Sequence, residues 1–403
     1  MKQVRLIIII ILLMALLTAC EEKPAILWLD GVTDVSCFTD GMMQVSYEDA
    51  GSKSGYVDAD GKLVIRDAVG AVTAFMCNGR FADGRAKYMI DDKLGYIDKS
   101  GAVVIPAVYD DASVFVDGLA VVRKGDREEY IDADGKTVLV CPDGYFAGGH
   151  GTGIAQHPIY RFSEELALIT TTEGTTAFVD RQGKVAIPEN VEYELADLFA
   201  EGFACVVKDL RSNEPRFGFI DKSGQITIPI QFEQAQSFSE GLAAVRINGK
   251  WGFIDRVGAI VIPAEYDWVR DFEDGLAVAA KEGICTFIDS NGAPAFDFRC
   301  DLAFGFRGGF ATVSKDERWG VIDRSGNLVT DYQYDYIGTF DLGVAVASLR
   351  AENNESKQGI IDSKGNVLLE IVYDQVHRSE DDPSLFVVRQ GERYGIFRVK
   401  KTN

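Results

Sequence analysis

Phe238-Ser-Glu-Gly-Leu-Ala-Ala-Val245 is followed by Trp251-Gly-Phe-Ile-Asp255, Arg-Val-Gly258, Ile260-Val-Ile-Pro263 and Tyr266-Asp267. Leu-Ala-Ala-Val and Trp-Gly-Phe-Ile each alternate with the two-residue period of a β-strand. Asp255-Arg-Val-Gly258 is typical of a type I turn followed by a left-handed glycine, which is a common hairpin connection. The segment therefore predicts a unit of three or four short strands and contains no helical pattern.

The same unit recurs along the chain, with an Asp-x-x-Gly segment in nine copies that lie 34 to 48 residues apart. Each aspartate is expected to accept backbone N–H groups within its turn, while the glycine supplies a positive φ angle. A Phe-x-x-Gly anchor precedes every copy except that at Phe162, where Glu165 replaces the glycine. A tenth, partial copy at Tyr394-Gly-Ile-Phe397 has Arg398 in the aspartate position. The nine predicted structural turns are Asp58 and Gly61, Asp98 and Gly101, Asp132 and Gly135, Asp180 and Gly183, Asp221 and Gly224, Asp255 and Gly258, Asp289 and Gly292, Asp323 and Gly326, and Asp362 and Gly365.

A proline follows the turn glycine by five residues in four copies, at Pro106, Pro188, Pro229 and Pro263. Because proline cannot donate to a strand ladder, it is predicted to end the next strand.

These repeats predict an all-β tandem array over residues 34–403, for which two architectures are open. A β-propeller usually contains four to eight blades of four strands. Nine or ten units exceed that number of blades, and a unit of about 34 residues is short for a four-stranded blade. An open or superhelical array accommodates any number of copies, because each copy buries its face on its neighbours. The open array is therefore favoured, with the β-propeller as the alternative.

The pattern F-x-E-G-L-A-x-V, then W-G-[FY]-I-D-x-x-G and V-I-P-x-x-Y-D, resembles the bacterial WG-repeat family over roughly residues 38–397. The Trp-Gly pair itself occurs at Trp251-Gly252 and Trp319-Gly320, with Tyr394-Gly395 as a near match. In the other copies the tryptophan position holds Ser54, Leu94, Glu128, Thr176, Phe217, Cys285 or Gln358. The resemblance implies an array of β-units in exported or membrane-linked proteins, and it implies no reaction.

The N-terminal segment contains an unbroken apolar run of twelve residues, Leu6 to Leu17, preceded by basic residues. A membrane-spanning helix needs about 20 residues, so the run is typical of a secretory signal. It ends in Leu17-Thr-Ala-Cys20, which resembles a bacterial lipobox, whose thiol accepts a lipid. We therefore expect a signal peptide at 1–19, lipidation of Cys20, a tether at 20–33 and attachment to an extracytoplasmic membrane face of the cell envelope.

The composition narrows the expected partners. Acidic residues outnumber basic residues by 62 to 41, and the resulting net charge of −21 makes nucleic acid an unexpected partner. Besides Cys20, an even number of cysteines remains, which permits disulfides in an exported chain and leaves 15 pairings open. Because their spacing is irregular, we interpret them mostly as small buried hydrophobes. They are Cys37, Cys77, Cys141, Cys205, Cys285 and Cys300.

Two kinds of segment invite a chemical interpretation. Asp58-Ala-Asp60-Gly61 and Asp132-Ala-Asp134-Gly135 resemble the start of a calcium loop but lack its later acidic ligands. Gly148-Gly-His-Gly-Thr-Gly153, in an irregular insertion at about 141–161, lacks the lysine of a phosphate-binding loop. We expect this insertion to be a surface loop and the first candidate for ligand contact. No catalytic residue, metal ligand or cofactor is predicted.

The lipobox, the repeat frame and the lack of a catalytic motif favour a lipid-anchored binding or scaffold protein of the cell envelope over an enzyme. Its expected ligand is a protein or an envelope polysaccharide. The alternative is an extracytoplasmic hydrolase that acts on glycans with two of the many carboxylates.

Overall fold

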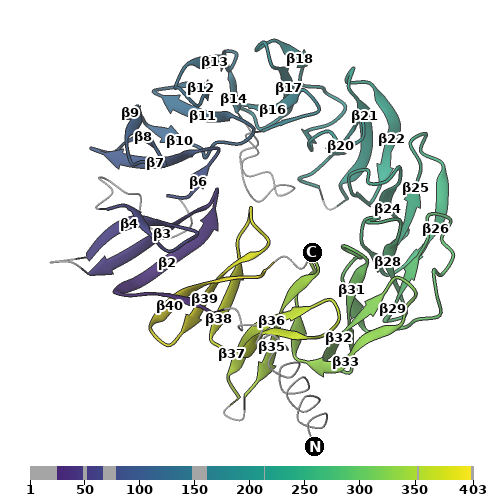
Figure 1. Ribbon diagram of the computed structural model, residues 1–403. Helices are drawn as coiled ribbons and strands as arrows, with labels where there is room; N and C mark the ends of the chain where they lie inside the picture. The colour runs from purple at the N-terminus through teal and green to yellow at the C-terminus, as the bar shows by residue number, and fades with distance from the viewer. Residues whose placement is uncertain are drawn as a thin grey trace, which may run out of the picture.

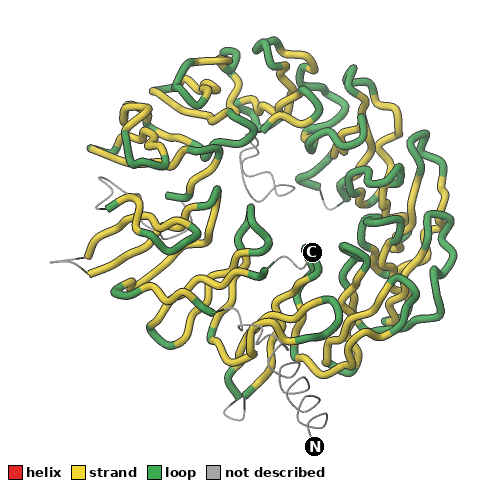
Figure 2. Tube along the Cα trace, in the orientation of Figure 1, coloured by secondary structure: helices red, strands yellow, loops and turns green. Residues whose placement is uncertain are grey.

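The computed structural model describes residues 25–48, 52–66, 79–147, 161–212, 214–351 and 354–400. Within these ranges the chain consists of strands, turns and loops (Figure 2), and no helix there is long and apolar enough to span a bilayer. The strands form ten small antiparallel sheets arranged in a ring (Figure 1). The all-β prediction is confirmed, and the structure takes the second of the two predicted architectures, a β-propeller with ten blades.

Blades 1 to 5 follow one another along the first half of the chain. Blade 1 comprises β2 (Val32–Thr39), β3 (Met42–Glu48), β4 (Ser52–Asp58) and β5 (Leu63–Ile65). Blade 2 comprises β6 (Phe81–Ala82), β7 (Arg85–Ile90), β8 (Lys93–Asp98) and β9 (Val103–Tyr109). Blade 3 comprises β10 (Asp111–Ala112), β11 (Leu119–Lys124), β12 (Arg127–Asp132) and β13 (Thr137–Val140). Blade 4 comprises β14 (Tyr145–Ala147), β15 (Phe162–Ser163), β16 (Leu166–Thr171), β17 (Thr176–Asp180) and β18 (Val185–Ile187). Blade 5 comprises β19 (Leu195–Ala196), β20 (Phe203–Lys208), β21 (Arg216–Asp221) and β22 (Ile226–Phe232).

Blades 6 to 10 complete the ring. Blade 6 comprises β23 (Gln234–Ala235), β24 (Ala243–Ile247), β25 (Lys250–Ile254) and β26 (Ile260–Tyr266). Blade 7 comprises β27 (Trp268–Val269), β28 (Ala277–Lys281) and β29 (Ile284–Ile288). Blade 8 comprises β30 (Leu302–Ala303), β31 (Phe310–Lys315), β32 (Arg318–Asp323) and β33 (Leu328–Tyr334). Blade 9 comprises β34 (Tyr336–Ile337), β35 (Val344–Arg350), β36 (Ser356–Asp362) and β37 (Val367–Tyr373). Blade 10 comprises β38 (Gln375–Arg378), β39 (Leu385–Gln390), β40 (Arg393–Arg398) and β1 (Leu27–Leu29).

The strands of a typical blade run from the centre of the ring to its rim. The first strand lies at the inner edge and the fourth, such as β22, β26 or β33, at the rim (Figure 1). Because successive strands are antiparallel, the turns after the first and third strands lie on one face of the ring. We call this the Asp-Gly face, since it carries the Asp-x-x-Gly turns; the turns after the second strands lie on the opposite face.

The first strand of the chain closes the ring. β1 pairs with β40 through Leu27↔Ile396 and Leu29↔Tyr394, so the two ends of the repeat array share blade 10. This pairing corrects the predicted tether at residues 20–33, because Leu27–Leu29 belong to the propeller. A closed ring leaves no terminal blade with an uncovered apolar face, which a linear array would have to cap.

The core lies between neighbouring blades. The anchor phenylalanine of one blade packs against an aromatic ring on the third strand of the blade before it, as for Phe238 on Phe219 at a centroid distance of 5.0 Å and Phe272 on Phe253 at 4.9 Å. All four side chains are at least 96% buried. Each buried phenylalanine contributes about 1.5–3 kcal/mol through area removed from water. The recurrence of the anchor phenylalanine in each copy thus reflects packing between blades.

The glycine after the tryptophan position lets the rim strand approach closely. A Cβ on Gly252 would lie 2.5 Å from the carbonyl oxygen of Ile262, where the pairing of β25 with β26 shifts register. Pro263 lies inside this irregular part of β26, where the ladder does not use its missing N–H. The prediction that proline ends the strand is therefore wrong for Pro106, Pro229 and Pro263, which lie within β9, β22 and β26. β18 does end at Ile187, directly before Pro188.

Candidate functional site

The nine Asp-x-x-Gly segments all form the same turn on the Asp-Gly face. In the copy at Asp255, the carboxylate Oδ1 accepts the N–H groups of Val257 at 3.0 Å and Ala259 at 2.9 Å. Gly258 has a φ angle of +81° and donates its N–H to the carbonyl of Asp255 at 3.0 Å. The same acceptors and donors occur at Asp58, Asp98, Asp132, Asp180, Asp221, Asp289, Asp323 and Asp362.

Hydrogen bonding favours the ionised form of several of these aspartates. The hydroxyl of Ser100 and the backbone N–H groups of its turn lower the pKa of Asp98. The hydroxyl of Ser223 does the same for the pKa of Asp221. Among the described residues, no group of three or more His, Cys, Asp or Glu side chains is arranged to hold a metal ion.

The turn glycine also packs against the preceding blade, which turn reasoning did not predict. A Cβ on Gly258 of blade 6 would lie 3.2 Å from the Ile228 side chain of blade 5. In the same way, a Cβ on Gly292 would lie 3.1 Å from the Ile262 side chain, and a Cβ on Gly224 would lie 2.7 Å from the Ile187 side chain. The glycine is therefore required both for its positive φ angle and for close contact between blades.

A second acidic residue, missed by the sequence analysis, joins successive blades on the Asp-Gly face. It precedes the glycine of the Phe-x-x-Gly anchor and adopts a positive φ angle, +53° at Glu201 and +52° at Glu240. The Glu201 carboxylate accepts the N–H of Gly241 in the next blade at 2.9 Å, and Glu240 accepts that of Gly275 at 2.9 Å. Equivalent bonds join Asp40 to Gly84, Asp83 to Gly118, Glu164 to Gly202 and, across the ring closure, Asp381 to Gly41.

A basic residue directly after the turn aspartate strengthens this contact. Arg256 forms an ion pair with Glu201 at 2.9 Å, and Lys222 forms one with Glu164 at 2.9 Å. Partial burial opposes the ionisation of Glu201, but the hydrogen bonds from Arg256 and Gly241 outweigh it and hold its pKa below the ordinary value. The recurring acid before the glycine and the base after the aspartate were both visible in the sequence.

The opposite face carries a matching row of carboxylates at the Asp of the Tyr-Asp motif. Asp267 lies between blades 6 and 7, where it pairs with Lys250 and accepts the N–H of Glu282 at 2.6 Å. The hydrogen bond from Lys250 is the main cause of its lowered pKa. Asp374 likewise pairs with Lys357 at 2.7 Å. Both faces are thus joined from blade to blade by carboxylates.

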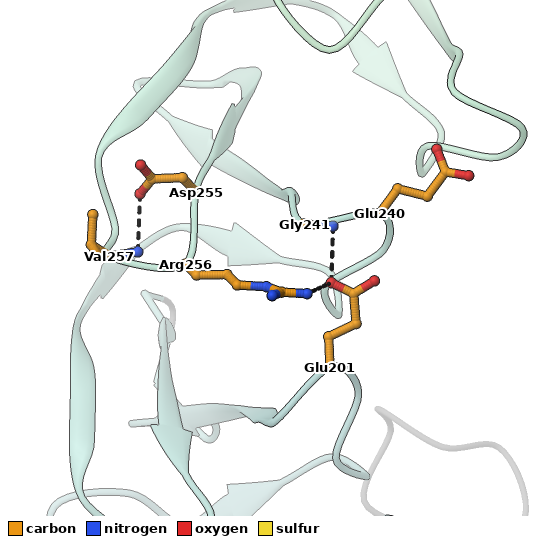
Figure 3. A pocket seen from close by; sticks show the side chains of 6 residues that line it. All are labelled: Glu201, Glu240, Gly241, Asp255, Arg256 and Val257. Carbon is orange, nitrogen blue, oxygen red and sulfur yellow. Dashed lines mark hydrogen bonds and ion pairs between the residues drawn. The ribbon is translucent and has the colours of Figure 1, made fainter.

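A cleft of about 510 Å³ lies on the Asp-Gly face between blades 5 and 6. Figure 3 shows Arg256 directed at Glu201, while Glu240 points away from both. The carboxylates of Glu201, Glu240 and Asp255 are all engaged by the contacts given above. The charged groups of this cleft therefore bond to groups of the protein itself, and they hold blades 5 and 6 together.

The inner edge of the ring differs in polarity from blade to blade. The first residue of the inner strand is an exposed polar residue at Asp111, Gln234 and Gln375. In blades 8 and 9 the same position holds Leu302 and Tyr336, which are 50% and 45% exposed. In blade 7 it holds the half-buried Trp268. We call the surface that Trp268, Arg270, Leu302, Phe304 and Tyr336 form at the inner edge of blades 7 to 9, together with Trp319 of the third strand β32, the apolar sector.

Aromatic contacts fix the geometry of the apolar sector. The rings of Phe304 and Trp319 stack with centroids 5.4 Å apart, and Tyr336 of the next blade meets Trp319 edge-on at 5.6 Å. The guanidinium of Arg270 lies 5.0 Å from the centre of the Phe304 ring. An aromatic cluster beside an exposed cation is thus held between three blades, and its exposed members, Leu302 and Tyr336, are available to contact an apolar face of a ligand.

The remaining predicted sites have different outcomes. Cys20 and residues 148–160, with His150, His157 and most of the glycine-rich segment, lie outside the described residues. The beginning of the insertion forms β14, which pairs with β16. Cys141 and Cys205 are buried thiols, and burial raises the pKa of each to about 12.

Ten antiparallel sheets, joined on both faces and closed by β1, define the protein as a β-propeller built from tandem repeats. The family model described as "WG containing repeat" matches residues 95–127, 177–209, 217–251, 251–283, 286–319, 319–350 and 359–394. These segments cover more than half of the sequence, and the chain belongs to the WG-repeat family.

Comparison with curated proteins finds no match. Among solved structures, BamB from Moraxella catarrhalis is similar with a TM-score of 0.37 and 10% identity, covering 72% of this chain and 99% of that chain. The computationally designed Ika8 protein is similar with a TM-score of 0.37 and 11% identity, covering 71% and 95%. Saccharomyces cerevisiae Sqt1 is similar with a TM-score of 0.36 and 10% identity, covering 70% and 93%.

Proposed function

We propose that the protein is a binding or scaffold protein of the bacterial cell envelope, anchored by a lipid on Cys20, whose ligand is an envelope polysaccharide or a protein. The apolar sector is the observation that carries the proposal. It exposes Leu302 and Tyr336 at the inner edge of a rigid ring, beside the cation of Arg270. Sugar rings and apolar protein side chains both stack on such a surface.

The charge distribution supports the same proposal. Carboxylates on both faces are engaged in contacts between blades, as for Glu201 with Gly241 and Asp267 with Glu282. The net charge of −21 disfavours a phosphate-rich ligand. The lipobox at Leu17–Cys20 supports export and anchoring, which would present the propeller to extracytoplasmic ligands.

The experiment pairs ligand identification with matched variants. The full chain, Tyr336→Ala, and Gln234→Ala are compared on an array of envelope polysaccharides and in pull-downs from envelope extracts. Gln234 is the control because it holds the same strand position in blade 6. We expect wild type and Gln234→Ala to retain a ligand that Tyr336→Ala loses. Equal retention by all three proteins would exclude Tyr336 and the apolar sector from binding.

The hydrolase alternative requires two carboxyl groups, and Asp271, which follows Arg270 of the apolar sector, is a candidate for one of them. Asp271 is an exposed residue, and desolvation by its surroundings together with the negative charge of Glu273 raises its pKa. A carboxyl group with a raised pKa is suited to act as a general acid in glycoside cleavage. Release of reducing ends from an envelope polysaccharide, abolished by Asp271→Asn with binding retained, would establish this alternative in place of the binding-only function.

A further inference from the structure

Blade 7 departs from the other blades at its rim. Its sheet has three strands, and residues 294–300 replace the usual fourth strand with two isolated bridges, Ile288↔Pro294 and Cys285↔Cys300. In a standard blade the tryptophan position on the third strand pairs with the tyrosine of the Tyr-Asp motif, as in Trp251↔Tyr266 and Trp319↔Tyr334. In blade 7 both partners of this pair are cysteines.

The backbone places the two cysteines directly opposite each other. Cys285 donates its N–H to the carbonyl of Cys300 at 2.8 Å, and Cys300 donates its N–H to the carbonyl of Cys285 at 3.2 Å. Residues that exchange both bonds in an antiparallel ladder have Cα atoms about 5.5 Å apart, with side chains on the same face. Disulfides usually join residues whose Cα atoms are roughly 4.4–6.8 Å apart. The pair therefore meets the backbone requirement for a bond.

The two side chains also lie in the same buried cluster of the core. Cys285 is 0% and Cys300 4% exposed. The Cys285 thiol donates to the carbonyl oxygen of Asp301 at 3.0 Å, and the Cys300 thiol donates to the carbonyl oxygen of Cys285 at 3.8 Å. No other pair of described cysteines forms a bridge between strands.

We propose that Cys285 and Cys300 form a disulfide bond that holds residues 294–300 onto blade 7 in place of a regular rim strand. The oxidant is a small or protein-borne disulfide. The Cys285 thiolate attacks one sulfur of the oxidant and releases one thiol. The Cys300 thiolate then attacks the Cys285 sulfur and releases the second. In total, two protein thiols and one disulfide give one protein disulfide and two thiols.

Burial determines when this exchange takes place. An external disulfide cannot reach two sulfurs that are at most 4% exposed, so the bond forms while blade 7 is still open during folding. For the same reason, the finished bond resists thiol reductants until the blade is unfolded. This inference is independent of the ligand and concerns the stability of the scaffold on which the apolar sector is built.

The test uses the full chain refolded from urea with oxidised and reduced glutathione. The product is unfolded again without reductant, alkylated with N-ethylmaleimide, digested and analysed by mass spectrometry. We expect a linked pair of peptides containing Cys285 and Cys300, whereas Cys141 and Cys205 are alkylated. Alkylation of both Cys285 and Cys300, or their linkage to other cysteines, would overturn the proposal.

Hydrogen exchange tests the role of the bond. Protein refolded without oxidant should exchange the backbone amides of residues 295–300 at least tenfold faster than the oxidised protein. The rim strand β26 of blade 6 should be unchanged, and Cys300→Ala should match the reduced protein in either buffer. Cys205→Ala, a buried cysteine without a bridging partner, should respond to oxidant as wild type does. Equal exchange in the oxidised and reduced proteins would refute the claim that a disulfide holds this segment.

Discussion

Replacement of Gly258 by valine separates the two constraints on the turn glycine. The residue has a φ angle of +81°, and a new Cβ would lie 3.2 Å from Ile228 of the preceding blade. A left-handed conformation costs an L-residue roughly 1–2 kcal/mol. Added bulk in a packed contact costs about 1–3 kcal/mol more. Gly258→Val should therefore lower the free energy of unfolding by about 2–5 kcal/mol.

Gly174 provides a matched control within the same chain. It closes the same type of turn, because its N–H bonds the carbonyl of Thr171 at 3.0 Å and its φ angle is +86°. A Cβ there would meet nothing within 4 Å. Gly174→Val should therefore show the conformational cost alone, about 1–2 kcal/mol.

The assay is urea unfolding of both variants and wild type, followed by tryptophan fluorescence and by circular dichroism, with coincident transitions as the criterion for a free energy. We expect Gly258→Val to be clearly the less stable variant. Equal losses for Gly258→Val and Gly174→Val would refute the conclusion that the turn glycine is required for packing between blades.

Three further predictions concern the turn aspartates Asp255 and Asp221 and the lipid on Cys20. Asp255→Asn should change the free energy of unfolding little, because an amide oxygen still accepts the turn N–H groups. Asp255→Ala should lower it by roughly 0.5–2 kcal/mol. In thermal melts, a fall in the wild-type melting temperature on adding chelator would indicate a metal site instead. Because hydrogen bonding lowers the pKa of Asp221, its stabilisation is complete above the ordinary aspartate pKa and is lost as pH falls through the lowered value. Melting temperatures below about pH 4 should thus fall less steeply for Asp221→Asn, and an identical acid profile would contradict this. Cys20→Ser should abolish incorporation of a fatty-acid analogue, since serine cannot form the thioether, and equal labelling would place the lipid elsewhere.

The preferences of neighbouring residues were sufficient to predict the strands and turns of the repeat unit. The Asp255-x-x-Gly258 turn follows from the preferences of its own residues, because its hydrogen bonds close within five positions. The contacts between blades were not predicted in this way. Glu201 bonds Gly241 forty positions later, so a turn analysis of the Phe-x-x-Gly anchor does not reveal its partner.

Ring closure was harder to foresee for a related reason. β1 contributes only Leu27-Trp-Leu29, too few residues for a recognisable strand pattern, and its partner β40 lies at the other end of the array. Whether repeats close into a ring depends on the small rotation between successive units, which sums over ten blades. The apolar sector also depends on contacts between blades, since Arg270, Phe304 and Tyr336 come from three consecutive blades.

The function is tested most directly by hydrogen exchange with and without the ligand that the array or pull-down identifies. The proposal predicts slower exchange of backbone amides in β30 and β34, around Leu302 and Tyr336, when the ligand is bound. Exchange in the rim strands β22 and β26 should be unchanged. Protection confined to the rim strands or to the Asp255–Gly258 turn, with none at β30 and β34, would contradict binding at the apolar sector.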